Sequence, residues 1–370
     1  MRFFVPTDIY VEKDCVKKHA NQLLVVGTRA LIMTGRHSAV ANGSLNDVES
    51  VLNSGNIPFQ VFDEVEENPS TDTVRKAVQM ARNFKADFVI GIGGGSASAA
   101  AKAVSLLLLN PAVDADDLHK ASSSPLDHAP VVAVPTTCGT GSEATPVSII
   151  TNHGIQLKKS IPHVIFPALA LVDGKYLASA KKQLIVNTAV DALSHMVESI
   201  LNIKSNAFNR MFPEYGLKLW GECKSALLSD AAIDSGLYEK LMLTSTIAGM
   251  SIAHTSTSVP HGMSYDLTLH AGVPHGPAVG YFLAAYTEIC AKFVPEDVQK
   301  ILSLLGLKNI EEFAAMLRKL IGTCTIPSAL RDQFAAAMKK NRSKLDLVPG
   351  AITAADIDFI YEKSLVVESN

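Results

Sequence analysis

The sequence predicts two domains, an α/β domain followed by an all-α helical domain. Up to about residue 176, short apolar segments alternate with helix-like segments, which is the pattern of a doubly wound, mostly parallel sheet. A glycine triplet at residues 93–95 directly follows one apolar segment, where Rossmann-like folds bind a nucleotide phosphate. Beyond residue 176, strand-like segments disappear and amphipathic runs continue to the end. We therefore expect a nucleotide-binding domain at 1–176 and a helical domain at 177–370.

The elements of the first domain follow from hydrophobic periodicity. Its strand-like segments are short and apolar, whereas its helix-like segments repeat apolar residues every three or four positions. The expected strands cover residues 29–34, 59–62, 87–92, 131–134, 147–151 and 164–172. The expected helices cover residues 12–26, 47–54, 71–84 and 98–109.

The second domain shows only helical periodicity. The expected helices cover residues 182–201, 207–228, 235–254, 278–293, 295–305, 310–321, 327–340 and 354–363.

Composition narrows the class of protein. The chain has 370 residues, of which 48% are hydrophobic, so it is long enough for two hydrophobic cores. A formal net charge of −3 gives no electrostatic footprint for nucleic acid or an anionic membrane. The five cysteines are scattered and form no CxxC pair, which favours reduced thiols in a cytosol. No signal peptide is visible, and the longest apolar stretch, near residues 104–109, is too short to cross a bilayer. We expect a soluble, cytoplasmic protein.

The stretch at residues 259–276, VPHGMSYDLTLHAGVPHG, contains Val-Pro-His-Gly twice. Proline fixes φ and glycine frees it, so His261 and His275 are each expected on a stiff turn with room behind the imidazole. A single histidine is more often a surface or core residue than a ligand. The repeated motif favours metal binding for this pair.

Two further ligands are expected upstream. Asp191 and His195 are four positions apart in a helical pattern, so their side chains share one helix face. Together with His261 and His275 they form a set of nitrogen and oxygen donors, which suits Fe²⁺, Zn²⁺, Co²⁺ or Mn²⁺. Glu198 lies on the same face and is either a supporting residue behind the ligands or a solvated side chain.

Two loops of the first domain indicate nucleotide binding. Gly94, Gly95 and Ser96 begin a helix after a strand, and such a helix start points free N–H groups at a phosphate. The motif lacks the GxGxxG fingerprint, and a tight turn after a strand would explain it equally well. The loop at residues 135–143, PTTCGTGSE, offers hydroxyl donors, although a capped Thr/Ser-rich turn is the alternative.

Five motifs together resemble those of the iron-containing, or group III, alcohol dehydrogenases. They are DALSH at 191–195, PHGMSY at 260–265, PHG at 274–276, GGGS at 93–96 and PTTCGTGSE at 135–143. The resemblance covers nearly the whole chain. It implies a dehydroquinate synthase-like architecture and an NAD(P)-dependent alcohol dehydrogenase or aldehyde reductase, with Fe²⁺ as the first expected metal and Zn²⁺ as the second. A homodimer that binds a small alcohol or aldehyde is expected.

The resemblance also implies cofactor contacts. It assigns Gly94, Gly95 and Ser96 to the pyrophosphate of the nicotinamide cofactor, and Thr136, Thr137 and Thr140 to further contacts. Asn68 belongs to a turn that resembles the family's Asn-Pro-Thr turn beside the cofactor. Because these motifs fall in the first domain and the metal ligands in the second, we expect the active site in the cleft between domains.

Three positions depart from the family pattern. Ala99 stands where the family usually has Asp, so a hydrogen bond near the cofactor or substrate is lost. Tyr265 stands four residues after His261, where the family usually has a second His. His254 stands seven residues before His261, where an Asn is common. We take Tyr265 and His254 as candidate catalytic residues, with a packing role as the alternative for each.

Cofactor choice depends on the residues that follow the expected strand at 29–34. An acidic residue there holds the ribose 2′-hydroxyl of NAD, whereas an arginine accommodates the 2′-phosphate of NADP. Here the strand ends in Gly35, Arg36, His37 and Ser38, so nothing acidic repels a phosphate. We expect a preference for NADP(H), with a simple Gly-Arg turn as the alternative.

Two other functions remain open at this stage. One is a lyase of the dehydroquinate synthase type, which would need a cationic pocket for an acidic phosphorylated substrate, and no such cluster is visible near the ligands. The other is a nucleotide-binding relative that has lost catalysis, which Ala99 would permit. Net consumption of NAD(P)H with aldehydes separates the three functions.

Overall fold

The computed structural model describes residues 3–368, which divide into two compact units. The α/β unit is formed by residues 4–181 and 234–253, and the helical unit by the remaining described residues. The chain therefore passes between the units more than once. Each unit is described by itself below.

A six-stranded sheet forms the centre of the α/β unit, and all of its strand pairs are parallel. The spatial order is β1 (Asp8–Val11), β8 (Leu169–Val172), β5 (Val131–Pro135), β4 (Phe88–Gly93), β2 (Ala30–Thr34) and β3 (Phe59–Phe62). The four inner strands are buried along their whole length, as expected for a sheet covered on both faces. The predicted parallel α/β domain is confirmed.

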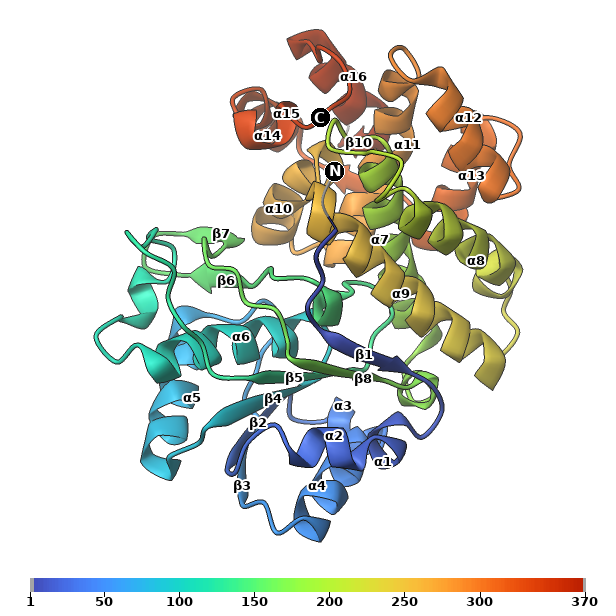
Figure 1. Cartoon of the computed structure of the whole chain (residues 1–370). Helices are drawn as coiled ribbons and strands as arrows, with labels where there is room; N and C mark the ends of the chain where they lie inside the picture. Colours follow the sequence, from blue (N-terminus) through green and yellow to red (C-terminus); the bar gives the residue numbers. More distant parts are fainter. Residues whose placement is uncertain (1–2, 369–370) are drawn as a thin grey trace. The chain divides into compact units, whose positions relative to one another are not determined.

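Helices cover both faces of this sheet, α5 and α6 on one side and α1 to α4 on the other (Figure 1). Their bounds are α1 Cys15–Lys18, α2 Ala20–Leu24, α3 Ser38–Ala41, α4 Ser44–Ser54, α5 Thr71–Phe84 and α6 Gly95–Leu109, with the short 3-10 turns η1 Ala115–Asp117, η2 Ser142–Ala144 and η3 Gly174–Leu177. Alternate residues of one strand serve opposite cores, since Leu31 belongs to the core with Val104 of α6 and Ile32 to the core with Val48 of α4.

Several predicted elements of this unit differ from the structure. The expected helix at 12–26 is broken at His19 into α1 and α2, and the expected strand at 164–172 begins only at Leu169, after Pro167. Of the expected strands, that at 147–151 corresponds to β6 (Ile149–Asn152), which pairs antiparallel with β7 (Leu157–Ser160) outside the main sheet. The sequence did not predict β1 or β7, because neither has the apolar pattern of a buried strand.

Helix α9 (Ser235–Thr255) contributes residues 234–253 to the α/β unit, although they follow two helices of the helical unit in sequence. The reason is a backbone contact between Gly249 and Gly141, which has a φ of 55°. A Cβ on Gly249 would lie 2.1 Å from the carbonyl oxygen of Gly141, so only glycine permits this approach. Ser245 and Thr246 add side-chain hydrogen bonds to the same loop.

The helical unit contains long helices and one small sheet, which confirms the predicted helical second domain apart from the added strands. Its elements are α7 Lys182–Ile200, α8 Met211–Leu228, α10 Val259–Ala271, α11 His275–Cys290, α12 Pro295–Leu304, α13 Ile310–Ile321, α14 Ser328–Met338, α15 Arg342–Leu345 and α16 Ala354–Ser364. Strands β9 (Cys324–Ile326) and β10 (Leu365–Val367) pair in parallel. The indole of Trp220 donates a 2.7 Å hydrogen bond to the Ala189 carbonyl and ties α8 to α7.

The two turns expected at His261 and His275, each between a proline and a glycine, are the starts of helices in the structure. Pro260 occupies the first turn of α10, and Pro274 caps α11. Proline is tolerated there because the first N–H groups of a helix have no partner within it. Helix α10 was therefore missed, since its Pro-His-Gly start resembles a turn.

All five cysteines are buried. Among residues 3–368, no helix combines the length and the apolar character needed to cross a lipid bilayer.

Candidate active site

Four predicted ligand residues lie together in the helical unit. Asp191 and His195 project from one face of α7, and their side chains are almost fully buried. His261 is the third residue of α10, and His275 is the first residue of α11. His261 and His275 are therefore each placed by the start of a helix, whereas His195 lies inside α7.

A close approach between α11 and α7 brings His275 to Asp191. A Cβ on Gly276 would lie 2.0 Å from the carbonyl oxygen of Asn187, so the glycine after His275 allows the two backbones to touch. Gly262, the glycine of the first Val-Pro-His-Gly, gives space to the side chain of Lys344, whose Cγ would be 3.0 Å from an added Cβ.

Three imidazole nitrogens converge on one carboxylate oxygen. The distances from Asp191 Oδ1 to Nε2 are 3.5 Å for His261, 3.7 Å for His275 and 3.8 Å for His195. These distances are too long for hydrogen bonds. They agree with donor atoms that share a metal ion, because bonds of about 2.1 Å in tetrahedral geometry place the donors about 3.4 Å apart.

Two buried polar atoms at the same place have the chemistry of metal donors. Within the described part of the chain, Asp191 Oδ1 and His261 Nε2 are buried and have no hydrogen-bond partner. Such atoms are rare in proteins unless an ion or a ligand satisfies them. Donor atoms of Asp191, His261 and His275 all lie within 4.8 Å of one another, and His195 adds a fourth donor beside Asp191. This donor set fits a divalent ion.

The charges of the site are strongly coupled. Burial opposes ionisation of Asp191, but the surrounding imidazoles of His195, His275 and His261 hold its pKa well below the ordinary value. Burial likewise opposes the charge on His261, but Glu198 and Asp191 raise the pKa of its imidazole to about 9. The pocket therefore favours positive charge next to two carboxylates, whether a proton or a metal ion supplies it.

Glu198 is fully buried behind His261 and is not a solvated side chain. Its Oε1 accepts the hydrogen bond from His261 Nδ1, and its Oε2 accepts from the Ser258 backbone N–H at 2.6 Å and from the Ser258 hydroxyl at 3.1 Å. A carboxylate on Nδ1 fixes the tautomer in which Nε2 is the free donor to a metal. Glu198 thus supports His261, which the sequence predicts as a metal ligand.

The two candidate catalytic residues have different surroundings. Tyr265 is half-buried, its ring lies parallel to that of His275 with the centroids 6.2 Å apart, and burial raises the pKa of its phenol above the ordinary value. His254 instead stacks on Phe3, with ring centroids 4.7 Å apart, and on Phe212 at 6.5 Å. The structure brings Tyr265 next to a predicted metal ligand, whereas the ring of His254 packs among aromatic side chains.

The predicted cofactor residues of the α/β unit gather at the carboxyl ends of β4 and β5. Gly93, with φ of 151°, turns the chain from β4 into α6, and its carbonyl accepts a 2.9 Å hydrogen bond from the Thr136 N–H. The Ser96 hydroxyl accepts a 3.2 Å hydrogen bond from the Asn68 N–H. This contact joins the Asn68 turn to the helix start.

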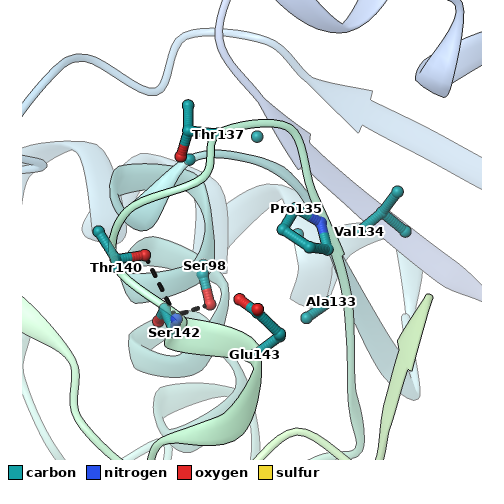
Figure 2. Close-up of a pocket in the computed structure, with 11 residues that line it drawn as sticks. Ser98, Ala133, Val134, Pro135, Thr137, Thr140, Ser142 and Glu143 are labelled. Carbon is teal, nitrogen blue, oxygen red and sulfur yellow. Dashed lines mark hydrogen bonds between the residues drawn. The ribbon is translucent and has the colours of Figure 1, made fainter. Parts of the chain in front are cut away.

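Gly94 and Gly95 keep space beside the second loop. A Cβ on Gly94 would lie 3.0 Å from Thr137 Oγ1, and one on Gly95 would lie 2.6 Å from Thr140 Cγ2. Figure 2 shows Thr137, Thr140, Ser98, Ser142 and Glu143 around the small pocket that separates this loop from the glycine-rich turn. The side chains of Ser98, Thr137, Thr140 and Ser142 thus line one small pocket beside the start of α6.

Two buried charged residues hold this loop, and sequence reasoning missed their role. Lys102 Nζ donates to the carbonyl oxygens of Ser142, Thr145 and Val147 at 2.7, 2.8 and 3.0 Å, and burial lowers its pKa to about 7. Glu143 accepts a 2.7 Å hydrogen bond from the Thr246 hydroxyl, and burial raises its pKa. The available signal was a lysine inside the apolar run of α6, because a buried ammonium group needs several hydrogen-bond acceptors around it.

Gly35, Arg36 and Ser38 follow β2, the strand next to β4 in the sheet. The side chains of Arg36 and Ser38 are exposed, and a Cβ on Gly35 would lie 3.3 Å from the Val65 carbonyl oxygen. Ala99 is buried in α6, and its carbonyl accepts a 2.8 Å hydrogen bond from the Ser148 hydroxyl.

Comparisons with known proteins agree with this arrangement. The sequence family described as iron-containing alcohol dehydrogenase matches residues 6–174, and its C-terminal family matches residues 185–346. The NADPH-dependent butanol dehydrogenase of Clostridium saccharobutylicum is 26% identical over 357 residues, covering 94% of this chain and 90% of that protein. The lactaldehyde reductase of Escherichia coli (strain K12) is 28% identical over 283 residues, covering 76% of this chain and 73% of that protein.

Solved structures give the same result. A crystal structure of an iron-containing alcohol dehydrogenase superposes with a TM-score of 0.91 and 34% identity, covering 98% of both chains. An iron-containing alcohol dehydrogenase from Thermotoga maritima superposes with a TM-score of 0.90 and 34% identity, covering 98% of this chain and 99% of that one.

Proposed function

Because the chain belongs to the iron-containing alcohol dehydrogenase family, we propose that it is a metal-dependent alcohol dehydrogenase or aldehyde reductase that prefers NADP(H). The substrate is a small alcohol or aldehyde. Membership of the family supports the oxidoreductase class, and the residues of the two sites support the finer parts of the proposal.

The convergence of three imidazole nitrogens on Asp191 Oδ1 carries the proposal. In this assignment Asp191, His195, His261 and His275 hold one divalent ion, with Fe²⁺ expected first and Zn²⁺ second. When bound, the ion supplies Lewis-acid polarisation of a substrate carbonyl, or favours the alkoxide of an alcohol.

The residues around the ligands then have separate tasks. Glu198 holds the Nδ1 proton of His261 and so keeps Nε2 turned toward the ion. The phenol of Tyr265, which stays protonated because burial raises its pKa, can donate a hydrogen bond to a substrate oxygen. No side chain needs to form a covalent bond with the substrate.

The cofactor residues of the α/β unit bind and orient the nicotinamide nucleotide. The nucleotide supplies or accepts the hydride. Gly94, Gly95 and Ser96 offer a glycine-rich helix start to the pyrophosphate, and Asn68, Thr136, Thr137 and Thr140 surround the same space.

A preference for NADP(H) is assigned to Gly35, Arg36 and Ser38. No carboxylate follows β2 directly, the Arg36 guanidinium is exposed, and the Ser38 hydroxyl lies at the start of α3. A 2′-phosphate would find a bidentate partner in Arg36 and a hydroxyl donor in Ser38.

Net oxidation of NADPH with a panel of aldehydes tests the function. Protein stripped with a chelator and reloaded with Fe²⁺ or Zn²⁺ should oxidise one NADPH for each aldehyde reduced, and the stripped protein should be inactive. A lyase of the dehydroquinate synthase type would leave the cofactor unchanged over a full cycle, and a relative without catalysis would bind NADPH without consuming it. Either of these results would refute the proposal.

A homodimer and a cytoplasmic location are part of the same proposal, on the grounds of the family resemblance and of the cysteine content. Light scattering of the purified protein and fractionation of cells measure them directly.

A further inference from the structure

The support of His261 extends beyond Glu198 to the segment 256–258, which joins α9 to α10. Ser258 donates to Glu198 Oε2 through its backbone N–H at 2.6 Å, and its hydroxyl lies 3.1 Å from the same oxygen. Oε1 of the same carboxylate accepts from His261 Nδ1. A displacement of Ser258 would therefore rotate the carboxylate that orients His261.

This segment needs contacts to hold its shape. Ser256 has a φ of 64°, in the left-handed region that side chains other than glycine disfavour. The Ser258 hydroxyl lies 3.1 Å from the Tyr286 hydroxyl, and Thr257, between Ser256 and Ser258, adds a separate contact to the carboxy-terminal part of the chain. The carbonyl and the hydroxyl of Thr257 both accept hydrogen bonds from Lys344 Nζ, at 2.8 and 2.7 Å.

Lys344 comes from the short helix α15, far along the chain from the ligands. Its aliphatic stem lies in the space left by Gly262, and its ammonium group lies 5.9 Å from the ring centroid of Tyr265. Burial lowers the pKa of Lys344 to about 8, while the negative charge of Glu198 opposes that shift. A mostly buried lysine is costly, and here it is directed at the segment that carries Ser258.

We propose that Lys344 is a positioning residue of the metal centre, which acts through Thr257, Ser258 and Glu198 on the ring of His261. The proposal rests on the proposed metal binding by the four ligands. It deepens the proposed function, because it names a residue outside the family motifs that sets how firmly the ion is held.

The test is the rate at which the metal-loaded protein loses Co²⁺ or Zn²⁺ to a chromophoric chelator. Lys344→Met keeps the stem and removes both hydrogen bonds, so metal loss should be about 10-fold faster, the low end of the effect of supporting residues. The visible spectrum of the Co²⁺ protein should change with it. Lys344→Arg keeps a donor cation and should restore most of the retention.

Lys339→Met is the matched control. Lys339 directly follows α14 and is close to Lys344 in sequence, but its ammonium pairs with Asp358 at 2.6 Å instead of with the 256–258 segment. It should lose metal at the rate of the parent protein. Equal rates for Lys344→Met and the parent, or equal acceleration in Lys344→Met and Lys339→Met, would overturn the proposal.

A second variant covers the case in which Lys344→Met does not fold. Thr257→Val keeps the lysine and the Thr257 carbonyl but removes one of the two acceptors, so it should release metal roughly two- to threefold faster, less than Lys344→Met because the hydrogen bond to the carbonyl remains. Unchanged release in Thr257→Val would then overturn the proposal. Failure of the proposed function is distinguishable, because a protein that binds metal in a Lys344-dependent way without reducing aldehydes would refute the function and retain the inference.

Discussion

The candidate metal site and the candidate cofactor site are built in opposite ways. At the metal site, side chains from α7, α10 and α11 converge, and three imidazole nitrogens lie 3.5–3.8 Å from Asp191 Oδ1. At the cofactor site, backbone turns form most of the site, and glycines leave room between the glycine-rich turn and the loop at 135–143. The first kind of site fails when an atom is removed, and the second when an atom is added. Substitutions that delete or add atoms can therefore test the two assignments separately.

Removal of one imidazole should have the largest effect. His261→Ala deletes one nitrogen donor and leaves Oε1 of the buried Glu198 without the His261 hydrogen bond, so metal should be lost and kcat/KM should fall about 1000-fold, equivalent to about 4 kcal/mol. Metal content and aldehyde reduction measure this. His270→Ala, on the exposed side of the same helix, is the control and should change neither. Full metal occupancy in His261→Ala would refute the ligand assignment.

Addition of a methyl group on α9, where that helix touches the cofactor loop, should come next. Gly249→Ala places a Cβ 2.1 Å from the Gly141 carbonyl oxygen, so we expect a loss of about 1–3 kcal/mol in the free energy of unfolding and a higher KM for NADPH. Metal content should stay constant. Gly236→Ala, near the start of the same helix, meets only an ordinary contact at 3.4 Å and should not lower stability, since alanine favours helices. Equal stability of both variants would contradict the backbone contact.

Addition of a charge at Gly35 should have a smaller, selective effect. Gly35→Asp introduces a carboxylate where a 2′-phosphate is expected and should lower the ratio of kcat/KM for NADPH to that for NADH roughly 30-fold. Gly35→Asn has nearly the same size without the charge and separates repulsion from the tight contact with Val65 O at 3.3 Å. A clear preference of the parent protein for NADH would reject the assignment.

Removal of one hydroxyl beside the metal ligands should have the smallest effect. Tyr265→Phe keeps the ring that lies along His275 and removes one donor, so kcat should fall about 2- to 10-fold with an unchanged Tm. Tyr265→His should shift the preference among aldehydes. Identical kinetics of Tyr265→Phe and the parent across the panel would make Tyr265 a packing residue.

The sequence predicted those elements whose pattern is local. Strand β3 (Phe59–Phe62) and helix α5 (Thr71–Phe84) match the expectation, because the periodicity of their apolar residues lies within the segments themselves. The fold class was confirmed because it too follows from local patterns, namely the alternation of strands and helices up to about residue 176 and helices alone beyond it. Helix α10 was missed because proline and glycine at its start indicate a turn unless the helix is already known.

The sequence could not predict contacts that depend on distant partners. Asp191 and His195 share a helix face by spacing alone, but the link from Lys344 to Thr257 spans 87 positions and leaves no periodic signal. The attachment of α9 to the α/β unit depends on two glycines, Gly141 and Gly249, which are separately unremarkable in sequence. Cofactor preference, substrate and the roles of Tyr265 and His254 remain predictions.

The membership of α9 in the α/β unit has a consequence for the order in which the chain folds during synthesis. All six strands of the sheet are complete once residue 172 has been made, but residues 234–253 of the same unit emerge only after α7 and α8. Until then, the loop at 135–143 lacks the hydroxyl groups of Ser245 and Thr246 that bind it. In the nascent chain, the α/β unit is therefore incomplete until α9 has been made. A fragment that ends at residue 181 would keep all six strands of the main sheet but would lack the helix that contacts the loop at 135–143.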